Sequence, residues 1–212
     1  MKTIVKSTLS PCLASQPVAQ EWYDFMRTQC HAEVGDNLRQ EQQFLCCYCE
    51  SEIGEDDSHI EHMVPRSIHN NLTYEYSNLA ASCNGGAVDH CGHFKDDNHR
   101  NPGYRYDASK FCPPHDANTC RLFSYLSDGD VIPAQGLSQQ DRDKAEYMIG
   151  YLGLTCSRLS GRRHSHAKNL IQTLGSNPDA ELVQWAMDYY LTPSSDGKLK
   201  AFISLSRTLL AQ

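Results

Sequence analysis

Five of the ten cysteines lie within one stretch of the chain, and their spacing is typical of a metal site. Cys46 and Cys49 form a C-x-x-C pair, which puts two sulfurs on one tight turn, near enough to share a tetrahedral zinc ion. Cys83 and Cys91 follow 34 and 42 positions after Cys49. These four thiolates would close a structural zinc site, whereas Cys47 is interpreted as a bystander.

Other interpretations of the cysteines stay open. A thioredoxin-type dithiol has the same C-x-x-C spacing, and free cysteines often pack as small apolar side chains. Because seven residues separate Cys83 from Cys91, His90 is an alternative to Cys91 as the fourth ligand. The five remaining cysteines are scattered and are expected to be inert, partly buried thiols: Cys12, Cys30, Cys112, Cys120 and Cys156.

A second group of polar residues lies between and just after the cysteine pairs. In the run HIEHMVPRS, strand alternation places His59 and Glu61 on one side and His62 on the other, and His59 is interpreted as a surface residue rather than a ligand. Asn78 and His93 follow. A neutral imidazole can take a proton from water, and a carboxylate with a second imidazole can hold a divalent ion against a phosphate. These residues supply the parts for metal-assisted phosphodiester hydrolysis.

Composition limits the class of protein. The 212 residues carry a net charge of −7, from 19 basic and 26 acidic residues, which excludes a strongly cationic nucleic-acid binder. No apolar run is long enough to span a membrane, and the start lacks the sustained apolar stretch of a secretory signal. We therefore expect a cytoplasmic protein whose cysteines are reduced.

Hydrophobic periodicity predicts helices before the cysteine-rich segment. Apolar residues at helical spacing, Val18 among them, predict a helix over residues 17–32. This helix is expected to stop near Gly35, and Asp36 to cap a second one that runs to about Phe44.

After that segment, alternation over 120–126 and 130–132 predicts a β-hairpin. A capping box at Ser138 opens the first of four helices, Gly175 ends the second, and Asn177-Pro178 opens the third. Their buried faces are expected to comprise Ala145, Met148, Ile149, Leu152, Ala167, Leu170, Ile171, Leu174, Leu182, Trp185, Ala186, Tyr189, Phe202, Leu205 and Leu209.

Four motifs in a fixed order carry a family resemblance: CxYCE, IEHxxPRS, YSNLxxSC and CGHxK, from Cys46 to Lys95. They are similar to the HNH endonucleases of the ββα-metal superfamily. More narrowly, they resemble the HNH effectors of retron and Septu-type anti-phage systems, which work beside an ABC-like ATPase. The resemblance covers about a quarter of the chain. It implies an α+β fold, with a zinc-stapled ββα-metal core embedded in a mainly helical domain.

The sequence divides into four parts, and the resemblance assigns roles within the core. The parts are an N-terminal helical segment (1–44), the nuclease core with its zinc site (45–100), a loop and β-hairpin (101–135) and a C-terminal helical region (136–212). His62 takes the place of the general base, and Glu61 that of a ligand for a catalytic Mg²⁺ or Mn²⁺. Asn78 matches the asparagine that orients the base. The final metal ligand is placed at His93, with His90 and Asp89 as alternatives, and the structural zinc set matches Cys46, Cys49, Cys83 and Cys91.

Phosphate contacts are expected from a few local cations. Lys95 and Arg66 match positions that can touch phosphate in the family. Arg158 and Arg162, with the neighbouring Arg163, form a basic stripe. We interpret this stripe as a surface that binds nucleic acid, called the rail below. The alternative is a solvated face or a surface that docks the ATPase. Since the chain is acidic overall, we expect weak, salt-sensitive binding of nucleic acid by the isolated protein.

The resulting prediction is a metal-dependent HNH endonuclease that cuts nucleic acid, with DNA favoured, as the effector of an anti-phage complex with an ABC-like ATPase. One alternative is a non-catalytic zinc module that docks nucleic acid or a partner. A second is a cytoplasmic redox protein built on Cys46 and Cys49, although the βαβ context that it requires is missing from the sequence.

Overall fold

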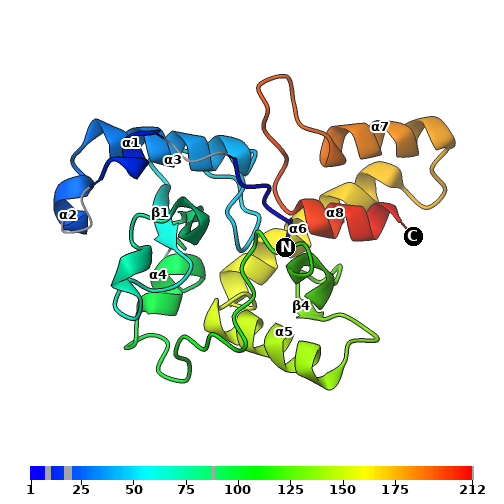
Figure 1. The fold of residues 1–212 in the computed structure, drawn as a ribbon. Coiled ribbons are helices and arrows are strands. Elements are labelled where there is room, and N and C mark those ends of the chain that lie inside the picture. The colour runs from blue at the N-terminus through cyan, green and yellow to red at the C-terminus, as the bar shows by residue number, and fades with distance from the viewer. Residues whose placement is uncertain (8–10, 17–20, 87–88, 212) are drawn as a thin grey trace.

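The computed structural model describes residues 1–7, 11–16, 21–86 and 89–211 (Figure 1). Helices are combined with two antiparallel sheets of two strands each, which confirms the expected mixture of helix and strand. The elements, η denoting a 3₁₀-helix, are α1 (Pro11–Ala14), α2 (Trp22–Phe25), α3 (Gln29–Glu41), β1 (Ser58–His62), η1 (Asn70–Leu72), η2 (Tyr76–Asn78), β2 (Leu79–Cys83), α4 (Cys91–Asp96), η3 (Thr119–Leu122), β3 (Phe123–Tyr125), β4 (Val131–Pro133), α5 (Gln139–Tyr151), α6 (Ser157–Leu174), α7 (Ala180–Leu191) and α8 (Ile203–Leu210).

The predicted break near Gly35 is wrong. Gly35 and Asp36 lie inside α3, which begins after Thr28, whose hydroxyl accepts a hydrogen bond from the first turn of the helix. A glycine inside a helix costs about 1 kcal/mol relative to alanine, and burial of the helix face that carries Val34 offsets this cost. Val18, which was assigned to the first predicted helix, lies outside the described residues.

A disulfide between Cys12 and Cys30 corrects the expectations that both are inert thiols and that the cysteines are all reduced. It forms because α1 packs against the beginning of α3, which brings the two Cα atoms to 5.7 Å. The three other scattered cysteines, Cys112, Cys120 and Cys156, are free and partly buried, as expected.

The central segment runs strand, strand, helix. β1 and β2 are antiparallel, with Ser58 opposite Cys83 and His62 opposite Leu79. All five residues of β2 are buried, because α3 and α4 both pack against this strand. The register therefore places the polar residues of β1 beside the first turns of α4, where the CGHxK motif lies.

The predicted hairpin and the cap of α5 are confirmed. β3 pairs with β4, with Phe123 opposite Pro133. The Ser138 hydroxyl accepts a hydrogen bond from the backbone N–H of Asp141, as in a capping box. Gly175 follows the last residue of α6 with a left-handed φ of 68°, which ends this helix where predicted.

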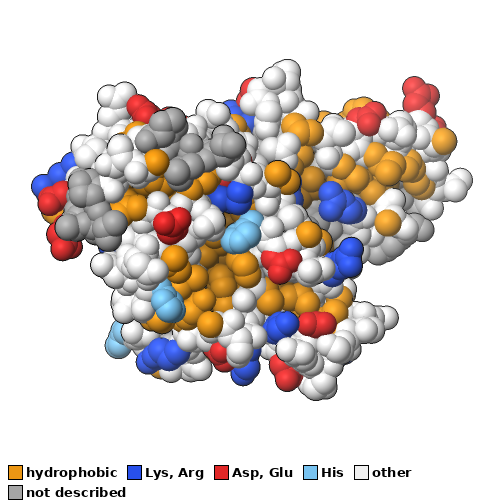
Figure 2. All heavy atoms as spheres, in the orientation of Figure 1, with side chains coloured by type: hydrophobic (Ala, Val, Ile, Leu, Met, Phe, Trp, Pro, Cys, Tyr) orange, Lys and Arg blue, Asp and Glu red, His pale blue; other side chains and the backbone are white. Residues whose placement is uncertain are grey.

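The prediction for α7 needs two corrections. The helix is capped by Asp179, whose carboxylate accepts from the backbone N–H of Leu182, and it does not open at Asn177-Pro178. Trp185 and Tyr189, expected in the core, are each 46% exposed, and Ala186 is buried. The reason is the position of α7 at the edge of the molecule, where it packs on α6 and α8 through one side (Figure 1), and Figure 2 shows apolar side chains on the surface of this region.

The C-terminal helices hold the cysteine-rich segment by hydrogen bonds. The buried Glu50 carboxylate accepts from the backbone N–H of Ser204 at 2.9 Å, and the Glu50 carbonyl accepts from the N–H of Phe202 at 2.9 Å. The N–H of Cys91, at the start of α4, donates to the carbonyl of Leu152 at 2.8 Å. The turn after Cys49 and the first turn of α4 are thus both positioned by segments more than 50 residues away in sequence.

None of the helices in the described part of the chain combines the length and the apolar character that crossing a membrane requires.

Candidate functional site

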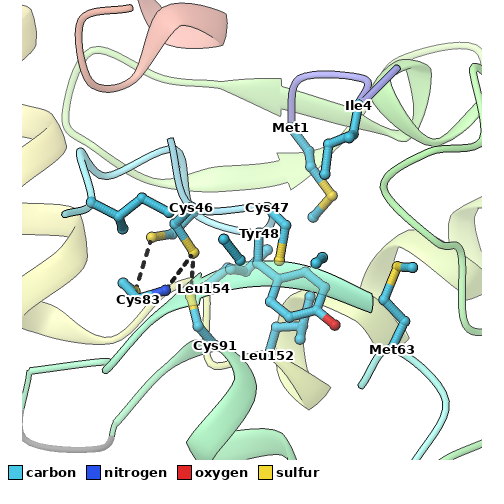
Figure 3. Packing of buried hydrophobic residues seen from close by; sticks show 14 of the residues in the cluster. Met1, Ile4, Cys46, Cys47, Tyr48, Met63, Cys83, Cys91, Leu152 and Leu154 are labelled. Carbon is cyan, nitrogen blue, oxygen red and sulfur yellow. Dashed lines mark hydrogen bonds between the residues drawn. The ribbon is translucent and has the colours of Figure 1, made fainter. Parts of the chain in front are cut away.

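The four cysteines assigned to zinc come together in one buried cluster. Their sulfur atoms all lie within 4.8 Å of one another, with 3.7 Å between Cys46 and Cys91 and 3.6 Å between Cys49 and Cys83. Figure 3 shows three of them facing one another, while the ring of Tyr48 extends away from the cluster. Four buried sulfurs at this spacing can hold a structural metal ion.

Hydrogen bonds within this cluster favour the binding of a metal ion. The N–H of Cys83 donates to the sulfur of Cys46 at 3.3 Å. Burial opposes ionisation of Cys49, but hydrogen bonds from the thiols of Cys83 and Cys91 help to lower its pKa to about 6, and thiolate is the form that binds metal. His90 lies beside the cluster, with Nδ1 3.1 Å from the sulfur of Cys91, but it is not one of the four mutually close ligands.

A groove of about 630 Å³ lies next to the strand–strand–helix segment and contains the polar residues of β1. The predicted site residues that line it are Glu61, His62, Arg66, His93 and Lys95, and His59 lines it as well. The alternative ligands Asp89 and His90 do not line it; Asp89 pairs with Arg158 at 2.5 Å. The structure therefore brings His93, rather than either alternative, to the groove that holds Glu61.

Glu61 is the buried charge at the floor of this groove. One carboxylate oxygen accepts from the Tyr48 hydroxyl at 3.0 Å and pairs with the Lys95 ammonium at 2.9 Å. The other lies 3.3 Å from Nε2 of His59. Burial alone would raise the pKa of Glu61, but Lys95 and His59 outweigh it and hold the pKa at about 2. Glu61 is therefore ionised at neutral pH.

His59, interpreted from the sequence as a surface residue, belongs to the same site. Its Nδ1 donates to the side-chain oxygen of Asn84 at 3.1 Å, and its ring stacks on that of His93 with 3.9 Å between centroids. Burial disfavours the protonated ring, but Glu61 outweighs burial and raises the pKa of His59. The strand alternation that pairs His59 with Glu61 was the signal for this role.

His62 is held in one orientation by a hydrogen bond and by ring packing. Its Nε2 donates to the carbonyl of Thr73 at 3.0 Å, which leaves the lone pair on Nδ1. The ring packs edge-on against Trp22, with 4.3 Å between centroids. Burial is the main cause that lowers the pKa of His62 to about 4, so the imidazole is neutral at physiological pH.

The side chain of Asn78 bonds to the backbone of a nearby loop rather than to His62. Its side-chain oxygen accepts from the N–H of Val64 at 2.8 Å, and its amide nitrogen donates to the carbonyls of Val64 at 3.1 Å and Leu72 at 3.2 Å. Asn78 thus ties together both ends of the loop between them. The carbonyl that holds His62, that of Thr73, follows directly after this loop.

Two of the predicted phosphate contacts are contradicted by burial. The Lys95 ammonium is fully buried between Glu61 and Asp96, 2.9 Å and 2.7 Å away, and so has no access to a phosphate. Arg163 is 1% exposed and donates to the carbonyl of Leu154 at 2.6 Å. The Lys95 ammonium is paired with both carboxylates, whereas Arg163 bonds only through Nη1, and its Nε and Nη2 are buried without a hydrogen-bond partner among the described residues.

The remaining residues of the predicted rail are exposed but held by the protein itself. Arg158 pairs with Asp89 at 2.5 Å, and Arg162 donates to the hydroxyl of Ser51 at 3.2 Å. None of the three arginines of the rail lines the groove that contains Glu61. Arg66 does line the groove, with its guanidinium 5.3 Å from the centre of the Trp22 ring.

Comparison with known proteins gives one informative match. No protein-family model matches the chain. The chain is 30% identical over 146 residues to the "Retron Vc95 putative HNH endonuclease" of Vibrio cholerae serotype O1 biovar El Tor. This chain resembles a retron HNH endonuclease. The match spans 66% of the chain and 66% of that relative, and it confirms the resemblance drawn from the motifs.

HNH nucleases depend on a metal ion, and the groove offers ligands that fit one. Glu61 and Nε2 of His59 lie 3.3 Å apart, close to the roughly 3.0 Å between neighbouring ligands of an octahedral ion with bonds of about 2.1 Å. Asn84 holds the proton on Nδ1 of His59, which leaves Nε2 to bind metal. The carboxylate suits Mg²⁺ or Mn²⁺, whereas imidazole ligands are more usual for transition metals, so this mixed set fits Mn²⁺ better than Mg²⁺.

The backbone of α4 passes close to Glu61 and His59 at Gly92. A Cβ atom at this position would lie 2.2 Å from the carboxylate of Glu61 and 2.7 Å from Nε2 of His59. We expect Gly92→Ala to displace Glu61 and to lower the cleavage rate by at least about tenfold, since displacement of about 1 Å in a catalytic group can cost ~100-fold.

The melting temperature should fall as well, because displacing the buried Glu61 carboxylate disturbs its contacts with Tyr48 and Lys95, so cleavage is compared at a temperature where the variant is folded. Gly161→Ala in α6 is the matched control, since nothing lies within 4 Å of a Cβ atom there. Equal cleavage rates for the two variants would mean that Gly92 does not shape the site.

Proposed function

We propose that this protein is a metal-dependent HNH endonuclease that hydrolyses phosphodiester bonds of nucleic acid, with DNA as its substrate. The observation that carries the proposal is the meeting of an ionised Glu61 with His59, His93 and a neutral His62 in one groove. The four-cysteine cluster supports a structural Zn²⁺, held by the turn at Cys46 and Cys49 together with Cys83 of β2 and Cys91 of α4. Residues 45–100 form the nuclease core in this proposal.

Each residue of the groove has a distinct role in the proposed reaction. Glu61, His59 and His93 would hold the Mg²⁺ or Mn²⁺ ion, which when bound supplies stabilisation of charge on the phosphate and on the departing 3′ oxygen. Tyr48 and Lys95 keep the Glu61 carboxylate ionised and in place by two hydrogen bonds to one of its oxygens.

His62 supplies the general base. Because Nε2–H is donated to Thr73, the lone pair on Nδ1 is free to take a proton from the attacking water. Asn78 keeps the carbonyl of Thr73 in place through the loop that it ties together. The reaction is a single hydrolysis step without a covalent intermediate.

We further propose that the nuclease is the effector of an anti-phage defence complex with an ABC-like ATPase. The name of the relative, which associates it with a retron, supports the retron branch of such systems over the Septu branch. The net charge of −7 supports dependence on a partner, since an acidic protein gains little binding energy from long-range attraction to DNA.

The decisive experiment is a nicking assay with purified protein and supercoiled plasmid, over a titration of Mg²⁺ and Mn²⁺. Glu61→Gln is expected to lower cleavage by about 100-fold or more and to remove its dependence on the ion, because a neutral amide is a poor ligand for hard cations. Glu55→Gln, an exposed change nearby in the chain, is the matched control and should cleave as the unmodified protein does.

A zinc module without catalytic activity would give band shifts and no product at any ion concentration, and that outcome would contradict the proposal.

A further inference from the structure

An arginine outside the four motifs lines the same groove as the catalytic residues. Arg105 lies in the loop between α4 and η3 and borders the groove together with Arg66, Glu61 and His62. It is exposed, and no carboxylate of the described residues forms an ion pair with it. Arg66 is likewise exposed and without such a partner among them. The groove therefore carries two guanidinium groups whose charge is not neutralised by the protein.

The loop that carries Arg105 is built rigidly. The buried Asn101 donates from its side chain to the carbonyl of Tyr151 at 3.0 Å. The Tyr147 hydroxyl donates to the carbonyl of Arg105 at 2.8 Å and accepts from the N–H of Asp107 at 2.9 Å. Both anchors belong to α5, so the C-terminal helical region sets the position of Arg105 at the groove.

The guanidinium of Arg105 is fixed at one nitrogen and open at the others. Nη1 donates to the carbonyls of Tyr104 at 2.7 Å and Asn101 at 3.2 Å, and also to that of Pro102 at 3.4 Å. Nε and Nη2 have no hydrogen-bond partner among the residues that the structure describes. A guanidinium anchored in this way presents two donors to a phosphate at little entropic cost.

We propose that Arg105 and Arg66 bind the backbone phosphates of duplex DNA that flank the scissile bond. This inference rests on the proposed nuclease function and replaces the rail predicted at Arg158, Arg162 and Arg163. Because the protein is acidic overall, these two contacts supply the local attraction that the surface as a whole does not.

The test measures the salt dependence of binding to a fluorescent DNA duplex, without added Mg²⁺ or Mn²⁺. A contact with one phosphate of duplex DNA contributes about 0.9 to the slope of log K against log salt. Arg105→Ala is expected to reduce this slope by about 0.9, and Arg105→Ala with Arg66→Ala by about 1.8. Arg105→Lys should keep the slope, and Arg121→Ala, an exposed arginine away from the groove, should leave it unchanged.

Cleavage kinetics provide the second readout. Loss of a charged hydrogen bond to substrate should raise KM by about tenfold for Arg105→Ala, with kcat within a few-fold of the unmodified value. A purely structural Arg105 would instead lower the melting temperature and leave the salt slope as it was, and this result would overturn the inference.

The outcomes separate this inference from the proposed function. Cleavage by the unmodified protein with an unchanged slope for Arg105→Ala refutes the phosphate contact alone. Binding without cleavage, accompanied by the expected loss of slope, refutes the nuclease and keeps the contact. Absence of any binding to duplex DNA at low salt contradicts both.

Discussion

We expect His62→Ala to lower the rate of DNA cleavage by about 100- to 10,000-fold, the range that general base catalysis contributes. In the structure this imidazole is neutral, with Nε2–H donated to Thr73 and Nδ1 left to accept a proton. Alanine would remove the proposed base and leave the proposed metal ligands in place. The measurement is therefore single-turnover cleavage at saturating Mg²⁺ or Mn²⁺. Binding of DNA should be unchanged within a few-fold, since the loss belongs to the chemical step.

His99→Ala is the control for the loss of a histidine as such. His99 is exposed and does not line the groove, and its variant should cleave at the unmodified rate. Addition of free imidazole should restore part of the activity of His62→Ala, because the space left by the side chain borders the groove. A His62→Ala protein that cleaves at the normal rate would remove His62 from the mechanism.

The second large effect is expected from Cys49→Ser, which should yield protein without zinc and without a cooperative fold. Binding of a structural zinc ion is worth about 10–16 kcal/mol in small zinc domains, which is as large as the whole stability of a typical domain. The cluster also lies where β2, α4 and the turn after Cys49 meet, so its loss separates these elements. Zinc content by elemental analysis and thermal unfolding by circular dichroism measure both consequences.

Cys47→Ala is the matched control, because Cys47 is buried next to the cluster but is not one of its four members. We expect this variant to keep one zinc ion per chain and to melt at a somewhat lower temperature from lost packing. If Cys49→Ser were as stable as the unmodified protein, the cluster would have no structural role. A chelator that strips the ion from the unmodified protein should reproduce the effect of Cys49→Ser.

Local signals in the sequence were sufficient where neighbouring residues determine the structure. The hairpin at Phe123–Tyr125, the cap at Ser138 and the end of α6 at Gly175 depend on turn and cap chemistry within a few residues. The cluster of four cysteines was also predicted, because two tight-turn sulfurs followed by two more cysteines favour a metal site over the alternatives. The pairing of Cys12 with Cys30 could not be read from spacing.

The sequence by itself determined which side chains are present for the proposed chemistry: the cysteine set, Glu61, His62, Asn78 and His93. Only the tertiary structure decided how each is used. Lys95 and Arg163 read as surface cations, yet packing buries both against interior acceptors, whereas Arg105 reads as an ordinary loop residue until α5 fixes it at the groove. The physical reason is that burial and ion pairing depend on contacts between segments far apart in the chain, which no local pattern encodes.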